Sequence, residues 1–342
     1  MRMPWWPPAT DSGTRRFVRL PTLTLAFIVA VLAFVAYFPF DWDPPHIARN
    51  DVTRTREGNL RFGAQNYARS DGSPEWLGAV QKAGHLTINL EALPYFPQRH
   101  APVSIMMLAQ DFWHTSFAIG QDDANLVLWL KRPGSTDNGD PPFTIPEVFR
   151  PNHWTRVQVE IAGMRLRVIV DGKVKLDERL SPGPLSSWHG GQVALGDEVH
   201  GGKGWGGEIR RAEVTTTGTT VDYVRSDALR VPSSYLYLPD HVAPFPPPSA
   251  SEWLALGLHL LSFIVVGLLV LWARRPRRPV VGVLSATILA SGIAVLLAVG
   301  KFCFYGRHTS AGDLVSQILG ALIGAILGWL ALRRRGQVLA GE

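Results

Sequence analysis

Four apolar runs, each close to twenty residues long, limit what this chain can fold into. A helix rises ~1.5 Å per residue, so about 20 residues cross a hydrocarbon core of ~30 Å. Backbone polar groups cannot stay unpaired in lipid, which leaves helices as the structure for such runs. We therefore expect four membrane-spanning helices, at residues 21–40, 253–272, 280–300 and 312–332.

Basic residues gather beside the predicted spans. The clusters are Arg15, Arg16 and Arg19, then Arg274, Arg275, Arg277 and Arg278, and finally Arg333 to Arg335. The positive-inside rule places all three in the cytoplasm. Both tails (1–20 and 333–342) are then cytoplasmic, and residues 41–252 lie outside a cell membrane. An uncleaved first span is favoured over a cleaved signal peptide, because apolar residues continue to Phe40.

The net charge of +6 does not indicate a nucleic-acid partner. The three clusters and Arg2 hold 11 of the 34 Lys and Arg residues, and the other 23 are set against 26 acidic residues. The basicity is therefore a signal of membrane topology, and membrane lipid is the expected partner. Cys303 is the only cysteine, so no disulfide can form within the chain.

Between the first and second spans the pattern changes to short strands. In residues 156–161 aliphatic and polar residues alternate, and Asp171-Gly172 is typical of a hairpin turn. Further strands are expected at 86–93, 103–110, 116–121, 125–132, 166–170, 191–197 and 207–214. Many short strands without convincing helices predict an extracytoplasmic, antiparallel all-β sandwich over 45–216. A proline-rich connector is expected at 217–251.

The order of these segments resembles the concanavalin A-like, laminin-G-type sandwich family. The similarity rests on "VSIMMLA", "SFAIGQDDANLVLWLKRP", "DNGDPP", "PNHWTRVQVEIAGMRLRVIVDG" and "VALGDEVHGGKGWGGEIRRAEV". It implies a jelly-roll fold over most of residues 50–216. It also implies binding of glycans or proteins, often with calcium.

The sequence favours a binding protein over an enzyme. Retaining glycosidases place two carboxyl groups ~5–5.5 Å apart. The Glu-x-Asp-x-x-Glu strand that carries them in related sandwich hydrolases is missing from this sequence. Zinc-ligand spacing, a phosphate-binding loop and a Gly-x-Ser-x-Gly elbow are missing as well.

Three groups of loop residues are candidates for contacting a glycan or calcium. Glycan sites combine aromatic platforms with polar groups, and calcium sites gather carboxylate and carbonyl oxygens. The candidates are Asp122, Asp123 and Asn125; Trp188; and Asp197, Glu198 and His200. Paired acids in turns also shape the backbone while staying solvated, and that alternative stays open. No cofactor is expected, with calcium in the sandwich as the alternative.

The region 252–332 resembles the VanZ-like membrane family. The similarity rests on "GRHTSAGDLVSQILGALIG", which supplies Gly306-Arg307, Asp313-Leu314, Gln317, Gly320-Ala321 and Gly324. The family's Glu-x-x-Gln is replaced here by Ala298 and Lys301. The resemblance implies a helical unit linked to cell-envelope phenotypes, with no agreed reaction.

Small residues recur at every fourth position of the last predicted span. They are Gly312, Ser316, Gly320, Gly324 and Gly328. Such a face lets another helix approach closely, so it predicts a helix–helix contact. His259 falls inside the second span, and an ionisable group at membrane depth is a candidate for function.

Two interpretations of Arg307 follow from its position before the last span. Ser310-x-x-Asp313 has the spacing of a capping box at the start of that helix. Arg307 can form a structural ion pair with Asp313 across the short turn. Alternatively, Asp313 holds Arg307 in place to bind a phosphate on a lipid-linked envelope glycan. With His259 and Gln317, these residues are the candidates for a site in the membrane.

The favoured functional hypothesis is a multi-pass protein of the cell membrane whose outer sandwich binds envelope or exported polysaccharide. One alternative is a transporter or enzyme that acts on lipid-linked envelope precursors around Arg307 and Asp313. Another is a structural subunit whose two parts make protein contacts.

Overall fold

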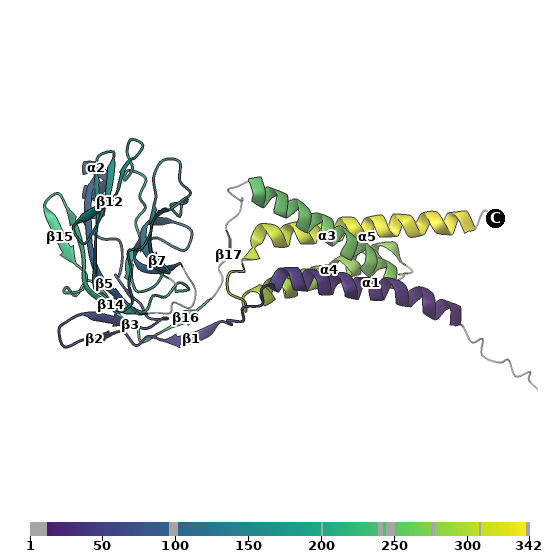
Figure 1. The fold of residues 1–342 in the computed structure, drawn as a ribbon. Coiled ribbons are helices and arrows are strands. Elements are labelled where there is room, and N and C mark those ends of the chain that lie inside the picture. The colour runs from purple at the N-terminus through teal and green to yellow at the C-terminus, as the bar shows by residue number, and fades with distance from the viewer. Residues whose placement is uncertain are drawn as a thin grey trace, which may run out of the picture. The chain divides into compact units, whose positions relative to one another are not determined.

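The structure is a computed structural model that describes residues 12–95, 102–199, 201–238, 242–243, 250–274, 276, 278–307 and 309–339. Within these ranges, the side chains of 12–19, 242–243, 250–252 and 335–339 are not described. The chain forms two compact units. Residues 45–238 form an all-β unit, and the remainder forms a helical one (Figure 1).

The all-β unit is a sandwich of two antiparallel sheets. The eight-stranded sheet contains β2 (Thr53–Arg54), β3 (Leu60–Phe62), β5 (His85–Pro94), β10 (Thr155–Ala162), β11 (Arg165–Val170), β12 (Lys173–Arg179), β14 (Gly207–Thr216) and β15 (Thr219–Asp222). The six-stranded sheet contains β4 (Ala68–Arg69), β6 (Val103–Ala109), β7 (Thr115–Asp122), β8 (Asn125–Leu130), β9 (Phe143–Ile145) and β13 (Gln192–Leu195). Their orders are β12-β11-β10-β5-β14-β3-β2, with β15 beside β14, and β4-β13-β6-β7-β8-β9.

The core of the sandwich is built by the alternation that the sequence shows. On β10, Val157, Val159 and Ile161 are buried and the residues between them are more exposed. The β11–β12 hairpin turns at Asp171 and Gly172, whose φ angles of 48° and 78° suit this tight turn. The predicted antiparallel sandwich is therefore confirmed.

The sandwich unit extends beyond the predicted boundary at 216 and includes a helix that was not predicted. β15 pairs with β14, and β16 (Ser234–Tyr237) pairs with β1 (His46–Arg49), so the compact unit runs to Leu238. Helix α2 (Leu77–Ala83) is only seven residues long. Trp76, just before it, donates through Nε1 to the Tyr223 hydroxyl at 2.8 Å, which ties the extension to the core.

The helical unit contains four long helices: α1 (Ser12–Tyr37), α3 (Ala250–Arg274), α4 (Pro279–Lys301) and α5 (Ala311–Leu339). A short parallel pair, β17 (Val242–Ala243) and β18 (Thr309–Ser310), precedes α5. Each long helix has a segment apolar and long enough to cross a membrane, as predicted. Large apolar side chains such as Val280 and Leu296 are 76% and 72% exposed, as lipid-facing residues would be.

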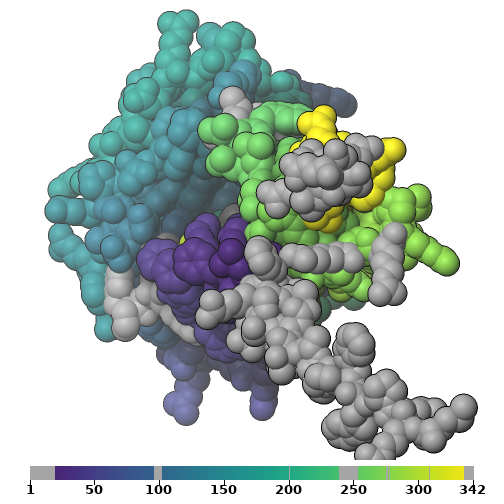
Figure 2. Space-filling model, turned by 90° about the vertical axis from the view of Figure 1, so that its right-hand side faces the viewer, coloured from purple at the N-terminus to yellow at the C-terminus, as the bar shows by residue number. Residues whose placement is uncertain are grey.

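The described residues of the three basic clusters lie at one end of this bundle. α3 ends at Arg274, four residues lie between it and the start of α4 at Pro279, and α5 ends beyond Arg333. Figure 2 views the bundle from this end, with purple α1, green α3 and α4, and yellow α5 in front. At the opposite end, the segment that follows α1 meets the loop after α4. There the Tyr305 N–H donates to the Asp41 carbonyl at 2.9 Å.

α5 packs against α3 through its small residues. A Cβ atom at Gly320 would overlap the carbonyl oxygen of Leu260, and one at Gly324 would overlap that of Ile264. Of the other members of the predicted face, Gly312 and Gly328 are buried and Ser316 is half-buried. The helices approach so closely at Gly320 and Gly324 that a side chain there would force them apart.

Candidate functional sites

The outer face of the six-stranded sheet carries a row of apolar residues that ends in a tryptophan. Ala194, Met107, Ala118 and Trp129 are successive cross-strand partners on β13, β6, β7 and β8. They belong to a small cluster that is separate from the main core. A Cβ at Gly120 would lie 2.9 Å from the Trp129 ring, so glycine makes room for that ring. Met107, Ala118 and Trp129 of this row line a hollow on this face.

Three loops form the walls of a groove of about 130 Å³ over this row. They contribute Phe112 from the β6–β7 loop, Asn138 and Asp140 from the β8–β9 loop, and Glu198 and Lys203 from the β13–β14 loop. Lys203 Nζ lies 2.8 Å from Glu198 Oε1 and 5.8 Å from the centre of the Phe112 ring. Two aromatic rings and an ion pair therefore share one hollow.

Three buried polar atoms of this groove have no hydrogen-bond partner in the described part of the chain. They are Ser104 Oγ, Asn138 Oδ1 and Glu198 Oε2. An unsatisfied buried polar atom costs about 1–3 kcal/mol, and native proteins leave few of them. Each of these three oxygens can accept a hydrogen bond. The groove is therefore suited to a ligand that carries hydroxyl donors.

Asp197 supports the loop that carries Glu198 and Lys203. Its side chain is fully buried, and Oδ1 accepts hydrogen bonds from the N–H groups of Glu198 at 2.7 Å and Lys203 at 2.8 Å. Burial raises the pKa of Asp197 to about 7, with a smaller contribution from the Glu198 carboxylate and against the effect of the amide hydrogen bonds. Asp197 does not line the groove, so it acts on the groove only through its loop.

Trp188, which the sequence suggested as a glycan platform, is instead a core residue. It is 2% exposed, its ring lies 5.5 Å from that of Phe117, and Nε1 donates to the Lys131 carbonyl at 3.0 Å. Its Gly/Ser/Pro-rich segment folds back over the edge of the core. This part of the prediction is wrong.

Asp122, Asp123 and Asn125 do not line the groove. Asp122 ends β7, and Asp123, with a φ of 52°, begins the turn to β8. Asn125 Oδ1 accepts from the Glu147 N–H at 3.3 Å. His200 lies outside the described residues. Within the described ranges, no three His, Cys, Asp or Glu side chains come together as metal ligands.

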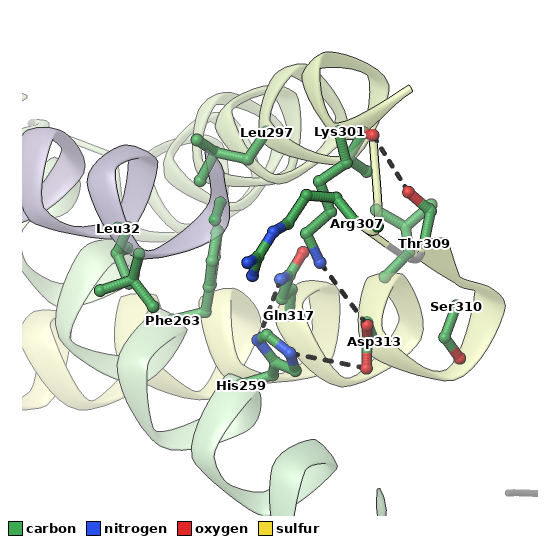
Figure 3. A pocket seen from close by; sticks show the side chains of 15 residues that line it. Leu32, His259, Phe263, Leu297, Lys301, Arg307, Thr309, Ser310, Asp313 and Gln317 are labelled. Carbon is green, nitrogen blue, oxygen red and sulfur yellow. Dashed lines mark hydrogen bonds and ion pairs between the residues drawn. The ribbon is translucent and has the colours of Figure 1, made fainter. Parts of the chain in front are cut away.

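A second hollow, of about 300 Å³, lies within the bundle where α1 and α4 end and α5 begins (Figure 3). Its polar lining residues are His259, Lys301, Arg307, Thr309, Ser310, Asp313 and Gln317. Its apolar lining residues include Leu32, Val35, Phe263, Leu297 and Leu314. The cavity is therefore amphipathic.

Asp313 pairs with two residues from other helices. Its Oδ1 lies 3.6 Å from His259 Nε2, and its Oδ2 lies 3.9 Å from Lys301 Nζ. Gln317, one turn further along α5, lies 3.3 Å from His259 Nδ1 through its amide nitrogen. Ser310 Oγ accepts from the Gly312 N–H at 3.0 Å and so caps α5. His259, Asp313 and Gln317, each predicted as a site residue, thus lie side by side.

Arg307 lies in the cavity without an acidic partner among the residues that the structure describes. Its Nε is buried and makes no hydrogen bond to any of them. Figure 3 shows its guanidinium turned toward Phe263 and Gln317, while Lys301 reaches Asp313. The predicted ion pair between Arg307 and Asp313 is therefore wrong. Lys301, from the last turn of α4, takes that place.

Sequence reasoning missed several residues of both hollows. Trp129 and Phe112 were not candidates, although Trp129 stands on the face of its strand opposite to Leu126 and Leu128. An aromatic residue on the non-core face was the signal that could have identified it. Lys301 was noted only as a departure from a family pattern, and its approach to Asp313 depends on how α4 meets α5.

Comparison with known proteins gives distant structural similarity only. No family model and no curated protein matches the chain. A structure of botulinum neurotoxin type C, described as entering cells through two ganglioside molecules, has a TM-score of 0.37 and 12% identity, covering 50% of this chain and 42% of that chain. The CBM40 domain of the Ruminococcus gnavus IT-sialidase has a TM-score of 0.36 and 14% identity, covering 46% and 88%. The botulinum neurotoxin serotype D binding domain has a TM-score of 0.38 and 8% identity, covering 50% and 43%.

Proposed function

We propose that the sandwich is a saccharide-binding domain of a multi-pass membrane protein. The observation that carries this proposal is the groove beside Trp129, in which three buried acceptors have no partner among the described residues. Sugar hydroxyls donate to such acceptors, and the apolar faces of sugar rings pack on aromatic side chains. Binding sites commonly combine aromatic walls with a few well-placed polar groups in this way.

The ion pair in the groove supports the same ligand class. Glu198 Oε1 is held by Lys203, while Oε2 of the same carboxylate stays unmet. A carboxylate oxygen held in this manner is a strong acceptor for a hydroxyl, because hydrogen bonds to charged groups are the stronger ones. Asp197 fixes the loop, so the acceptor is in place before the ligand arrives.

The proposal is tested on a glycan array with the purified full chain in detergent, with and without calcium. Trp129→Ala should weaken the strongest signal roughly tenfold, because aromatic packing adds about 0.5–1.5 kcal/mol beyond buried area. Trp154→Ala is the matched control: this half-buried tryptophan packs on Arg210 and does not line the groove. No signal on any glycan, or equal binding by the Trp129 variant, would favour the protein-contact alternative.

We further propose that the basic end of the bundle faces the cytoplasm and that the sandwich lies outside the cell membrane. The three basic clusters and the positive-inside rule support this orientation, and the VanZ-like similarity of residues 252–332 supports a place in the cell envelope. A reporter that works only outside the cytoplasm should be active after Leu238 and silent after Arg278 or Arg335. Activity after Arg278 would reverse the orientation.

A further inference from the structure

The polar end of the bundle cavity contains more positive than negative charge. Lys301 and Arg307 are cations, and Asp313 is the acidic lining residue among those described. Asp313 is already shared between Lys301 and His259. The Arg307 guanidinium is left without a counter-charge in the described part of the bundle. A half-buried cation in surroundings of low polarity is costly unless an anion joins it.

The start of α5 adds to the positive potential at this end. Thr309 and Ser310 line the cavity immediately before the helix begins at Ala311. The first amides of a helix have no partner within the helix, and its dipole is positive there. Ser310 Oγ meets one of these amides, that of Gly312. An anion at this end would therefore face both Arg307 and the helix start.

The other side of the cavity is hydrocarbon. Leu32 and Val35 come from α1, Phe263 from α3 and Leu297 from α4. A soluble anion makes no use of this wall, whereas a molecule with a charged head and an apolar chain fits both sides. A volume of about 300 Å³ is at the small end of ligand pockets, which hold roughly 300–1,000 Å³. It accommodates a head group and the first part of a chain.

We propose that this cavity binds a membrane lipid through its phosphate group, with Arg307 donating to the phosphate oxygens. The planar guanidinium offers parallel N–H groups that match phosphate oxygens, and its unmet Nε–H is one of these donors. Lys301 and His259 hold Asp313, which keeps its carboxylate paired and away from the guanidinium. The site lies wholly in the helical unit, so the lipid proposal does not depend on saccharide binding by the sandwich.

The test uses the purified full chain in a neutral detergent and three probes. Dioleoyl phosphatidic acid should raise the thermal unfolding midpoint and bind in native mass spectrometry. Dioleoylglycerol, which has the same chains without the phosphate, should do neither. Equal effects of the two lipids would overturn the phosphate assignment. Saturation of the effect by inorganic phosphate alone would overturn the lipid assignment.

Variants then separate binding from structural support. Arg307→Gln should weaken phosphatidic acid binding on the order of ten- to a hundredfold, and Arg307→Lys should recover only part of it because a point charge lacks the fork. Arg333→Gln removes an exposed charge elsewhere on α5, outside the cavity, and should change affinity less than about twofold.

The lipid-free unfolding midpoint of Arg307→Gln should stay close to that of the wild type, because no described acid loses its partner. A lowered midpoint with unchanged lipid affinity would overturn the proposal and assign Arg307 a structural role. If Arg307→Gln does not fold, Arg307→Lys keeps the charge and provides the affinity measurement instead.

Discussion

The groove on the sandwich and the cavity in the bundle differ in the kind of hydrogen bond that each leaves unmet. In the groove, the three unmet atoms are oxygens that accept: those of Ser104, Asn138 and Glu198. In the cavity, the unmet atoms include a cationic donor, Arg307 Nε, together with the Gln317 Oε1 acceptor. The groove is thus suited to neutral hydroxyl donors and the cavity to an anion. One compact unit therefore offers hydrogen-bond acceptors to a ligand, and the other offers a cationic donor.

The two units also treat charge differently. On the outer face of the eight-stranded sheet, Glu91 lies between Arg156 and Arg210, with Nε–oxygen distances of 2.6 and 2.5 Å. Both arginines remain partly exposed, so water solvates part of their charge. In the bundle, Arg307 lines a cavity with an apolar side and its Nε is buried, so water cannot do so to the same degree. An unmatched charge there carries more information about function than a matched one at the surface.

The largest expected effect comes from breaking the bundle while leaving the sandwich intact. Gly324→Leu should abolish folded, detergent-soluble bundle, because its side chain would overlap the α3 backbone at Ile264. The destabilisation should exceed the ~1–3 kcal/mol that is typical of overpacking. Ile323→Leu is the matched control, since Ile323 is 39% exposed. Fluorescence-detected size exclusion and the unfolding midpoint measure the outcome. Equal tolerance of both variants would show that this helix contact does not hold the cavity.

The sandwich was predictable from sequence because its information is local. The alternation along β10 and the Asp171-Gly172 turn specify a hairpin whichever strands it later joins. The four long helices were predictable for the same reason, since length and hydropathy are properties of a single segment. α2 was missed because seven residues show too little periodicity to be recognised.

The sites were less predictable because they depend on contacts between distant segments. Arg307 and Asp313 are six positions apart, yet Asp313 pairs instead with Lys301 of α4 and His259 of α3. Trp188 lies in a segment with loop composition, and only the folded chain shows that it turns into the core. Local spacing identified the residues of the cavity but not their partners.

The second prediction concerns the loop that forms a wall of the groove. The pKa of Asp197 is raised to about 7 in the folded protein, against about 3.9 for an ordinary aspartate. Between these values the folded protein keeps a proton that the unfolded chain has released, so the free energy of unfolding falls as pH rises. Above pH 7 the free energy of unfolding is lower by about 4 kcal/mol than at acidic pH. For a sandwich of this size, the unfolding midpoint should drop by about 10 °C.

This drop is measured by thermal denaturation of residues 45–238, a compact unit with its own core, between pH 4 and 8. Asp197→Asn should remove most of the drop, because the amide cannot ionise and its oxygen can still accept from the Glu198 and Lys203 N–H groups. The same slope in both proteins would show that other groups cause it. In that case the groove wall would not depend on a protonated Asp197.

The smallest expected effect tests how little a buried carboxylate contributes when two partly exposed arginines match its charge, in contrast to Arg307. Burial raises the pKa of Glu91, but the hydrogen bonds and charges of Arg210 and Arg156 outweigh this and leave it below its usual value. The stabilisation is therefore fully present above about pH 4.5 and is lost as pH falls through the lowered pKa, the opposite slope to that of Asp197. Because both arginines are partly exposed, Glu91→Gln should cost only about 1 kcal/mol at pH 7, or roughly 2–4 °C in the unfolding midpoint. The difference between the wild type and the variant should shrink as the pH falls below 4.5. A difference that persists unchanged at pH 3 would mean that Glu91 acts through packing, and the contrast between matched and unmatched charge would then rest on the bundle alone.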